Sequence, residues 1–334
     1  MAGSIDLRQH PLAPQICPWA LQLLSQLPAA SIRCIGLEFA SATGPVDLLL
    51  AIPIECLSQA ATCLNRGHEQ RQIGMCLQRL EQQSSLCSGV DHLWLELDHD
   101  RPGTFSTFLG HPGNVQRHQE RLTLLEMGER CLIQPGREAG STTALAQIKQ
   151  RLRNSRLLQR IQQGRHVLSE VGWMNRGDAS HLKLLITPGY QQRPKALLEH
   201  LLGPTLTATI EQQLLDPLSD QIDTNQEPLN VHLSLALGPS GLRAALEISH
   251  SPSQESGHFR STFCQNLQQL PSLRNQASGM IEYWQSSQRK ARSDGVNIQL
   301  SHLKIPISAA QLQLDASKYY LRLIPVQDQS NTPT

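Results

Sequence analysis

The chain has 334 residues and a mass of 37.1 kDa, enough for one large domain or two smaller ones. Its 29 Lys and Arg nearly balance 28 Asp and Glu, so the net charge of +1 excludes a broad basic surface for nucleic acid. No apolar run approaches the roughly 18 residues that span a bilayer. The first residues lack the pattern of a secretory signal, so we expect a cytoplasmic protein without a membrane or nucleic-acid partner.

The eight cysteines are scattered and form no Cys-x-x-Cys pair. No histidine lies at zinc-finger spacing from them, which argues against a structural zinc site. We expect reduced thiols that pack as small apolar side chains.

In chain order, a helical segment at 18–27 is followed by five pairs of strand-like segments. Turn residues join the members of the first four pairs, as hairpins require, and a polar loop joins the fifth. The predicted hairpins are 31–40 with 46–53, 91–98 with 104–110, 180–187 with 195–201, 230–237 with 242–249, and 297–308 with 317–326.

Helical periodicity lies between the hairpins, at 53–87, 143–168, 206–222 and 258–289, whereas 112–140 shows no clear pattern. The hairpins also resemble one another. The sequence Ser-His-Leu-Lys begins at Ser180 and again at Ser301, and Val-His-Leu-Ser begins at Val231. These copies indicate an internal repeat.

Along each predicted strand, one face is aliphatic and the other carries charged or polar side chains. The amphipathic helices should cover the aliphatic face. The predicted fold is therefore α+β: a single domain over 1–334 with a closed ten-strand antiparallel barrel, a polar lumen and helices outside. It requires the strands carrying Glu38 and Tyr320 to be neighbours. The alternative is a two-domain α+β protein, divided near Ala179, with two open sheets.

Lysine is rare, with six residues, and four of them fall on predicted hairpins: Lys183, Lys195, Lys304 and Lys318. Cations from several strands that point into one lumen need an anion, and a diphosphate suits ammonium groups. No Gly-rich phosphate loop is present. The alternative is that the lysines pair across the sheet with Glu96, Glu199 or Glu247.

These features resemble the ABBA aromatic prenyltransferases, a family of ten-strand barrels built from repeated αββα units. The resemblance covers roughly residues 15–326 and rests on the architecture and on three short sequences. These are Ser-His-Leu-Lys at 180–183 and at 301–304, and Lys-Tyr-Tyr-Leu-Arg at 318–322. The Lys-x-Tyr form of the family is kept only at Lys318, because Leu185 and Pro306 follow the other two lysines.

The resemblance implies transfer of a prenyl group from an allylic diphosphate, such as dimethylallyl or geranyl diphosphate, to an indole- or phenol-type acceptor, free or in a peptide. It implies Glu38 as the carboxylate that orients the acceptor, with Glu96 in reserve and Trp94 against the acceptor ring. The implied diphosphate ligands are Lys183, Lys304, Lys318, Arg322 and Tyr320, then Arg243, Lys195, His181, His232 and His302. We expect a monomer. The other reading is a non-catalytic barrel that binds an anionic amphiphile.

No cofactor is expected. A magnesium ion is compatible with this chemistry, but the chain has no DDxxD-type motif. Asp98 and Asp100 could bind Mg²⁺ or could be ordinary turn residues before Arg101. The three histidines at 181, 232 and 302 could form a metal site, but their equivalent repeat positions favour places spread around the barrel.

Overall fold

Strand β1 (Cys34–Phe39) pairs with both the second and the last strand of the chain in the computed structural model of this protein. Glu38 lies opposite Tyr320 of β11 (Lys318–Pro325), which meets the requirement set by the sequence. The structure describes residues 7, 13–40, 44–66, 70–82, 90–110, 157–176, 179–188, 193–219, 230–238, 241–249, 267–268, 270, 273–274, 278–283, 285–286, 296–308 and 311–325.

All neighbouring strands are antiparallel, and ten of them close into a barrel. Around the ring, β1 is followed by β2 (Val46–Pro53), β3 (His92–Leu97), β4 (Ser106–Gly110), β5 (His166–Arg176), β6 (Ala179–Pro188), β7 (Asn230–Gly238), β8 (Gly241–Ser249), β9 (Val296–Ser308) and β11. The two-residue β10 (Gln311–Leu312) pairs only with β9. Because one sheet includes both halves of the chain, the two-domain alternative with open sheets is wrong.

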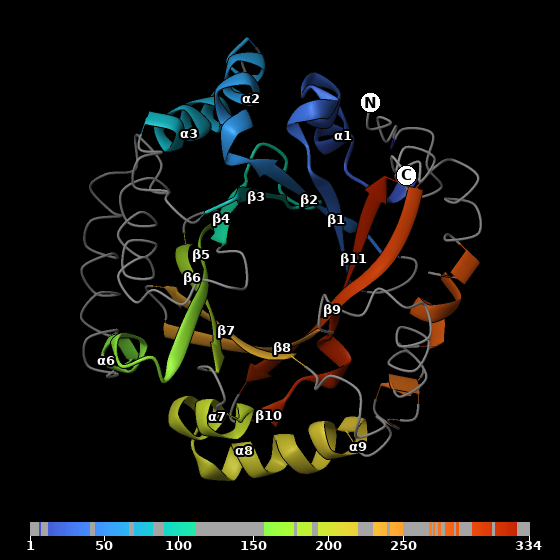
Figure 1. Cartoon of the computed structure of the whole chain (residues 1–334). Helices are drawn as coiled ribbons and strands as arrows, with labels where there is room; N and C mark the ends of the chain where they lie inside the picture. Colours follow the sequence, from blue (N-terminus) through green and yellow to red (C-terminus); the bar gives the residue numbers. More distant parts are fainter. Residues whose placement is uncertain are drawn as a thin grey trace, which may run out of the picture.

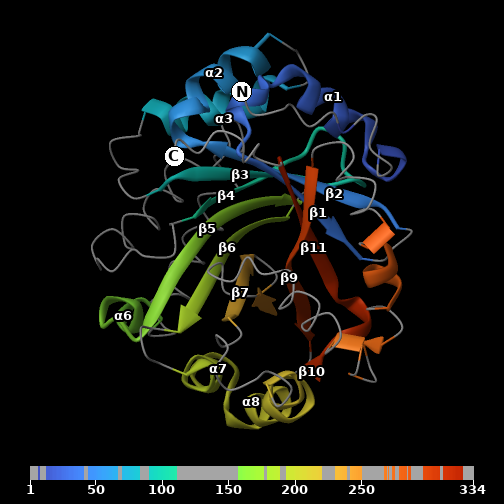
Figure 2. The same ribbon diagram turned by 45° about the vertical axis from the view of Figure 1, so that its right-hand side comes forward.

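Helices surround the ring of strands (Figure 1). They are α1 (Pro18–Gln26), α2 (Leu57–Leu64), α3 (Arg71–Gln82), α6 (Leu157–Gln162), α7 (Pro194–Leu202), α8 (Pro204–Ile210), the π-helical turn Glu211–Leu215 and α9 (Asp216–Ser219). Short 3₁₀ turns span Ala13–Gln15, Ala29–Ser31, Ile54–Cys56 and Leu314–Ala316. No helix in the described residues is long and apolar enough to cross a membrane. Figure 2 shows α1, α2 and α3 above one side of the barrel and α7 and α8 below the other.

The alternation of side chains separates the core from the lumen. Aliphatic residues such as Leu93, Leu182, Leu303 and Leu323 are buried in the core outside the barrel. The intervening residues, including Lys183, His302 and Arg322, line the interior cavity. A strand has a period of two, so it can present an apolar face to the helices and a polar face to the lumen.

The third hairpin differs from its prediction. Residues 195–201 are not a strand: they belong to α7, which begins at Pro194, in the first helical turn where proline is favoured. The partner of β6 is instead β5, so 166–168 are also not helical as predicted. The helical predictions at 143–156 and 220–222, most of 258–289, and Cys87, Cys131 and Cys264 lie outside the described residues. The five described cysteines form no disulfide with one another.

A histidine pair joins α7 to the start of β5. Nε2 of His166 lies 3.0 Å from Nδ1 of His200, and Nδ1 of His166 lies 2.8 Å from the carbonyl of Arg165. Burial lowers the pKa of His166 to about 4, from a usual value of 6.5. The folded protein therefore disfavours the charged form of this ring.

Stability should consequently depend on pH between about 6.5 and 4. In that window the unfolded chain binds the proton and the folded chain does not, so stability falls as the pH falls. The loss that His166 causes should approach about 3 kcal/mol near pH 4, at about 1.4 kcal/mol per pKa unit. Urea unfolding at pH 7 and pH 4.5 measures it. The variant His166→Asn should show a smaller difference between the two, and an unchanged difference would contradict the assignment.

Candidate functional site

The lumen contains a cavity of about 210 Å³. Its walls come from strands all around the barrel, so residues far apart in the sequence meet there. It is lined by Gly36, Leu49, Trp94, Glu96, Phe108, Glu170, Lys183, Leu185, His232, Glu247, Ser249, Ser301, His302, Tyr320, Leu321 and Arg322. Charged groups and aromatic rings thus line the same cavity.

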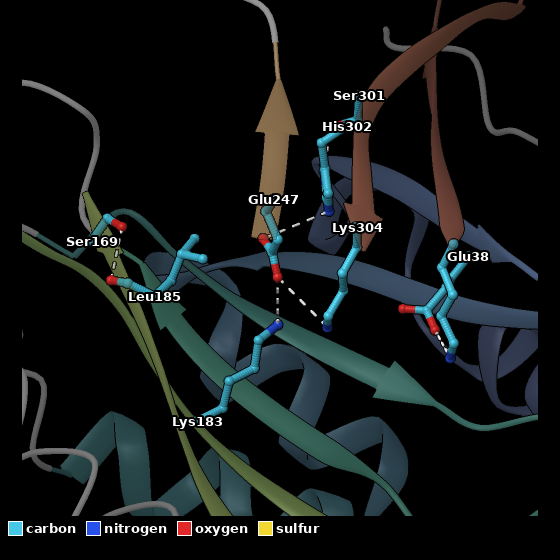
Figure 3. Close-up of polar contacts among 9 residues, drawn as sticks. Glu38, Ser169, Lys183, Leu185, Glu247, Ser301, His302 and Lys304 are labelled. Carbon is cyan, nitrogen blue, oxygen red and sulfur yellow. Dashed lines mark hydrogen bonds and ion pairs between the residues drawn. The ribbon is translucent and has the colours of Figure 1, made fainter. Parts of the chain in front are cut away.

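Glu247 of β8 is the centre of a buried charge cluster. Its Oε1 lies 3.6 Å from Nζ of both Lys183 and Lys304, and its Oε2 lies 3.9 Å from Nε2 of His302. Figure 3 shows the two lysines approaching this carboxylate from different strands. The predicted alternative, in which lysines pair with sheet carboxylates, therefore holds for Lys183 and Lys304 with Glu247. Both ammonium groups still lie beside the cavity wall that Glu247 forms.

The electrostatics of this cluster follow from burial. Burial alone would raise the pKa of Glu247, but Lys183 and Lys304 hold it well below its usual range. Burial would lower the pKa of Lys183, and the surrounding carboxylates raise it instead. Burial and the nearby Lys183 lower the pKa of Lys304. The cluster therefore contains two cations on one carboxylate, a local excess of positive charge that an anion could neutralise.

A second cluster surrounds Glu38, which is 3% exposed. The ammonium of Lys318 binds Glu38 and lies 3.9 Å from Asp47. Burial would raise the pKa of Glu38, but Lys318 and the other lysines lower it. Burial and the charge of Glu38 raise the pKa of Asp47 to about 6.

Glu38, Asp47 and Glu96 bring carboxylate oxygens within 4.8 Å of one another, a spacing that could hold a metal ion. Lys318 already supplies a cation there.

The three histidines form no such group within the described part of the chain. Asp98 is buried, and Asp100 lies 3.8 Å from Arg101.

Three cations lie against aromatic rings. Nζ of Lys183 is 4.6 Å from the centre of the Phe108 ring, the guanidinium carbon of Arg322 is 5.8 Å from that of Trp94, and Nζ of Lys304 is 5.9 Å from that of Tyr320. These contacts fall within the range of cation–π attraction. The lumen therefore combines anion-binding groups with ring faces that can stabilise a cation.

Histidines complete the wall near Tyr320. The ring of His302 stacks on Tyr320 with centres 3.9 Å apart, and burial lowers the pKa of His302 to about 3. His232 lies opposite Glu247, with its Nε2 3.4 Å from Oγ of Ser249. A register shift in β9 next to Tyr320 leaves Ser301 without an opposite residue and places both Ser301 and His302 at the cavity.

Two predicted ligands, Lys304 and Lys318, pair with Glu247 and Glu38 and are not among the residues that line the cavity. Three further predicted ligands do not line it either. Lys195 is exposed on α7, outside the barrel, where it binds Glu211 at 2.8 Å. Arg243 is exposed near the start of β8. His181 is buried against Gly238, where a side chain would collide with its ring.

Glu170 and Phe108 are among the cavity residues that sequence reasoning missed. Phe108 lies on a predicted strand opposite Trp94 and could have been found from the alternation that placed Trp94 in the lumen. Glu170 lies on the unpredicted β5.

A scan against protein-family models and a search of curated proteins give no match to this chain. Its fold, a closed ten-strand antiparallel barrel with several helices, thus stands on the structure alone.

Proposed function

We propose that this protein transfers a prenyl group from an allylic diphosphate to an aromatic acceptor inside the barrel. The observation that carries the proposal is the placing of Lys183 and Arg322 over aromatic rings at the wall of the lumen cavity. The antiparallel ten-strand architecture further supports the resemblance to ABBA prenyltransferases.

In the proposed reaction, the allylic C–O bond breaks and its electron pair leaves with the diphosphate. Lys183, Lys304 and Arg322 stabilise the departing negative charge. The ring faces of Trp94, Phe108 and Tyr320 shield the allylic cation from water. An aromatic carbon of the acceptor then forms the new C–C bond, and a carboxylate accepts the ring proton.

Glu38 is proposed to orient the acceptor, with Glu96 as the second candidate. Glu96 lines the cavity, whereas Glu38 lies beside it on β1, two residues from the cavity-lining Gly36. A negative carboxylate accepts a hydrogen bond from an indole N–H or phenol O–H and makes the ring more electron-rich.

The second candidate function is a non-catalytic barrel that binds an anionic amphiphile. It is favoured by the loss of the Lys-x-Tyr form after Lys183 and Lys304, where Leu185 and Pro306 replace the tyrosines that would shield a carbocation. The two functions differ in pyrophosphate release, so a screen of dimethylallyl and geranyl diphosphate against indoles, phenols and aromatic peptides separates them. Products with the added prenyl mass support transfer, and binding without pyrophosphate release supports the alternative.

Replacing Lys183 or Lys304 with alanine should weaken donor binding or turnover by at least about tenfold. Each removes a charge-assisted contact of about 1.5–3 kcal/mol. Calorimetry with inorganic pyrophosphate and turnover with dimethylallyl diphosphate measure the effect. Lys195→Ala is the matched control, because that lysine is exposed on α7 and should leave both quantities unchanged. If both the Lys183 and the Lys304 variant keep full activity, these lysines do not bind the donor and their role is structural.

A further inference from the structure

Glu170 enters the lumen through an irregularity in β5. The register of β5 and β6 shifts between Leu168 and Glu170, which leaves Ser169 as the extra residue of a bulge. The hydroxyl of Ser169 donates a hydrogen bond to the carbonyl of Leu185, at 3.0 Å (Figure 3). A bulge re-aims the following side chain, and here the following side chain is a carboxylate that lines the cavity.

The opposite position on β4 leaves room for this carboxylate. Glu170 faces Gly110, and a Cβ at Gly110 would lie only 3.3 Å from Cγ of Glu170. On the other side, Glu170 pairs in register with Leu185, whose side chain cannot bind it. The backbone thus provides space for a carboxylate but no polar partner in either neighbouring register position.

The side chain of Glu170 makes no hydrogen bond and no ion pair with any residue that the structure describes. The ammonium of Lys183 makes its ion pair with Glu247, at 3.6 Å. Burial raises the pKa of Glu170, although the charges of Lys183, Lys304 and Arg322 act to lower it. A desolvated carboxylate that forms no ion pair of its own is costly, and a cationic group bound beside it in the cavity would reduce that cost.

The charges at the cavity are already balanced before any ligand binds. Its lining includes the carboxylates Glu96, Glu170 and Glu247 and the cations Lys183 and Arg322, and the ammonium of Lys304 lies 3.6 Å from Glu247 beside the same wall. Oε1 of Glu247 is buried and has no hydrogen-bond partner among the described residues. A bound diphosphate would add further negative charge, so a second ligand with positive charge would balance the pair.

We propose that the cavity binds an aromatic molecule that carries a protonated amine, and that Glu170 is the carboxylate that binds this amine. The aromatic part lies among Trp94, Phe108 and Tyr320. The inference that this molecule is the prenyl acceptor rests on the proposed function. The inference that the cavity binds it holds whether or not prenyl transfer takes place.

A series of phenols that share a para-ethyl unit and differ in the charge at its end tests the proposal. Tyramine carries an ammonium, 4-ethylphenol is neutral, and 3-(4-hydroxyphenyl)propionate carries a carboxylate. Calorimetry without donor should show tyramine binding at least about tenfold more tightly than either of the others. Equal affinity for tyramine and 4-ethylphenol would overturn the proposal, and this test needs no variant.

The variant Glu170→Gln assigns the amine to this carboxylate. It should lower the affinity for tyramine by about tenfold and leave that for 4-ethylphenol within twofold. Glu199→Gln, exposed on α7, is the control and should change neither. Retained preference for tyramine in Glu170→Gln would overturn the assignment.

The proposed function is tested separately: each phenol is incubated with the protein and dimethylallyl diphosphate, and mass spectrometry detects the prenylated product. Tight tyramine binding without any prenylated product would refute the transfer and keep the amine site. Prenylation of 4-ethylphenol together with equal affinity for tyramine and 4-ethylphenol would support the transfer and refute the amine site.

Discussion

Replacing Glu247 with glutamine should lower the free energy of unfolding by about 3–5 kcal/mol at neutral pH, the usual cost of removing one partner from a buried ion pair. The change leaves Lys183 and Lys304 both near a neutral amide, within a lumen where their side chains are only 12% and 17% exposed. Urea unfolding of the variant and the parent measures the loss. Glu199→Gln is the control for a change of charge at an exposed position.

The same variant has a second readout, because an added anion can replace the missing carboxylate. Inorganic pyrophosphate should stabilise Glu247→Gln more than it stabilises the parent protein. This gain follows from linkage, since at a given concentration the ligand that binds the folded state more tightly stabilises it more. If the free energy of unfolding changes by less than about 1 kcal/mol and pyrophosphate stabilises both proteins equally, Glu247 is not the counter-ion of these lysines.

Replacing Glu38 with glutamine should lower prenyl transfer by about 10²-fold or more, the contribution expected of a positioned base. The shape is kept and only the charge is removed. Diphosphate binding should be nearly unchanged, and hydrolysis of the donor should persist, because water then meets the allylic cation. Prenyl transfer and pyrophosphate release, measured in parallel, distinguish these two steps.

Asp47→Asn is the matched control for Glu38→Gln. Asp47 belongs to the same carboxylate cluster and also faces Lys318, at 3.9 Å, but it has no proposed contact with the acceptor. Its replacement should therefore leave transfer within a few-fold of the parent. Equal loss of transfer and pyrophosphate release in Glu38→Gln, or no loss of either, would make Glu96 the acceptor carboxylate.

The barrel could be predicted because its evidence is local in the sequence. Alternation with a period of two is visible in each short strand, and turn residues mark four of the hairpins. The prediction failed at 195–201, where Pro194 begins a helix instead of ending a turn. It also missed β5, because the bulge at Ser169 breaks the alternation and puts Leu168 and Val171 on the same buried side.

The charge pairing in the lumen is the part that alternation does not encode. The faces of Lys183, Lys304 and Glu247 were predictable, but Lys183 and Glu247 come from β6 and β8, which are not adjacent in the sheet. Which carboxylate meets which lysine depends on barrel curvature and side-chain length. For the same reason, the binding of Lys318 by Glu38 could not be assigned from the sequence.

The closure of the barrel between β1 and β11 has a consequence for synthesis on the ribosome. Glu38 is made early, whereas its counter-ion Lys318 and its register partner Tyr320 are among the last described residues. Until β11 emerges, β1 has an open edge and Glu38 has no Lys318 to neutralise it. A nascent chain arrested before residue 318 should therefore remain open and sensitive to protease, and closure should follow only after the final strand is released.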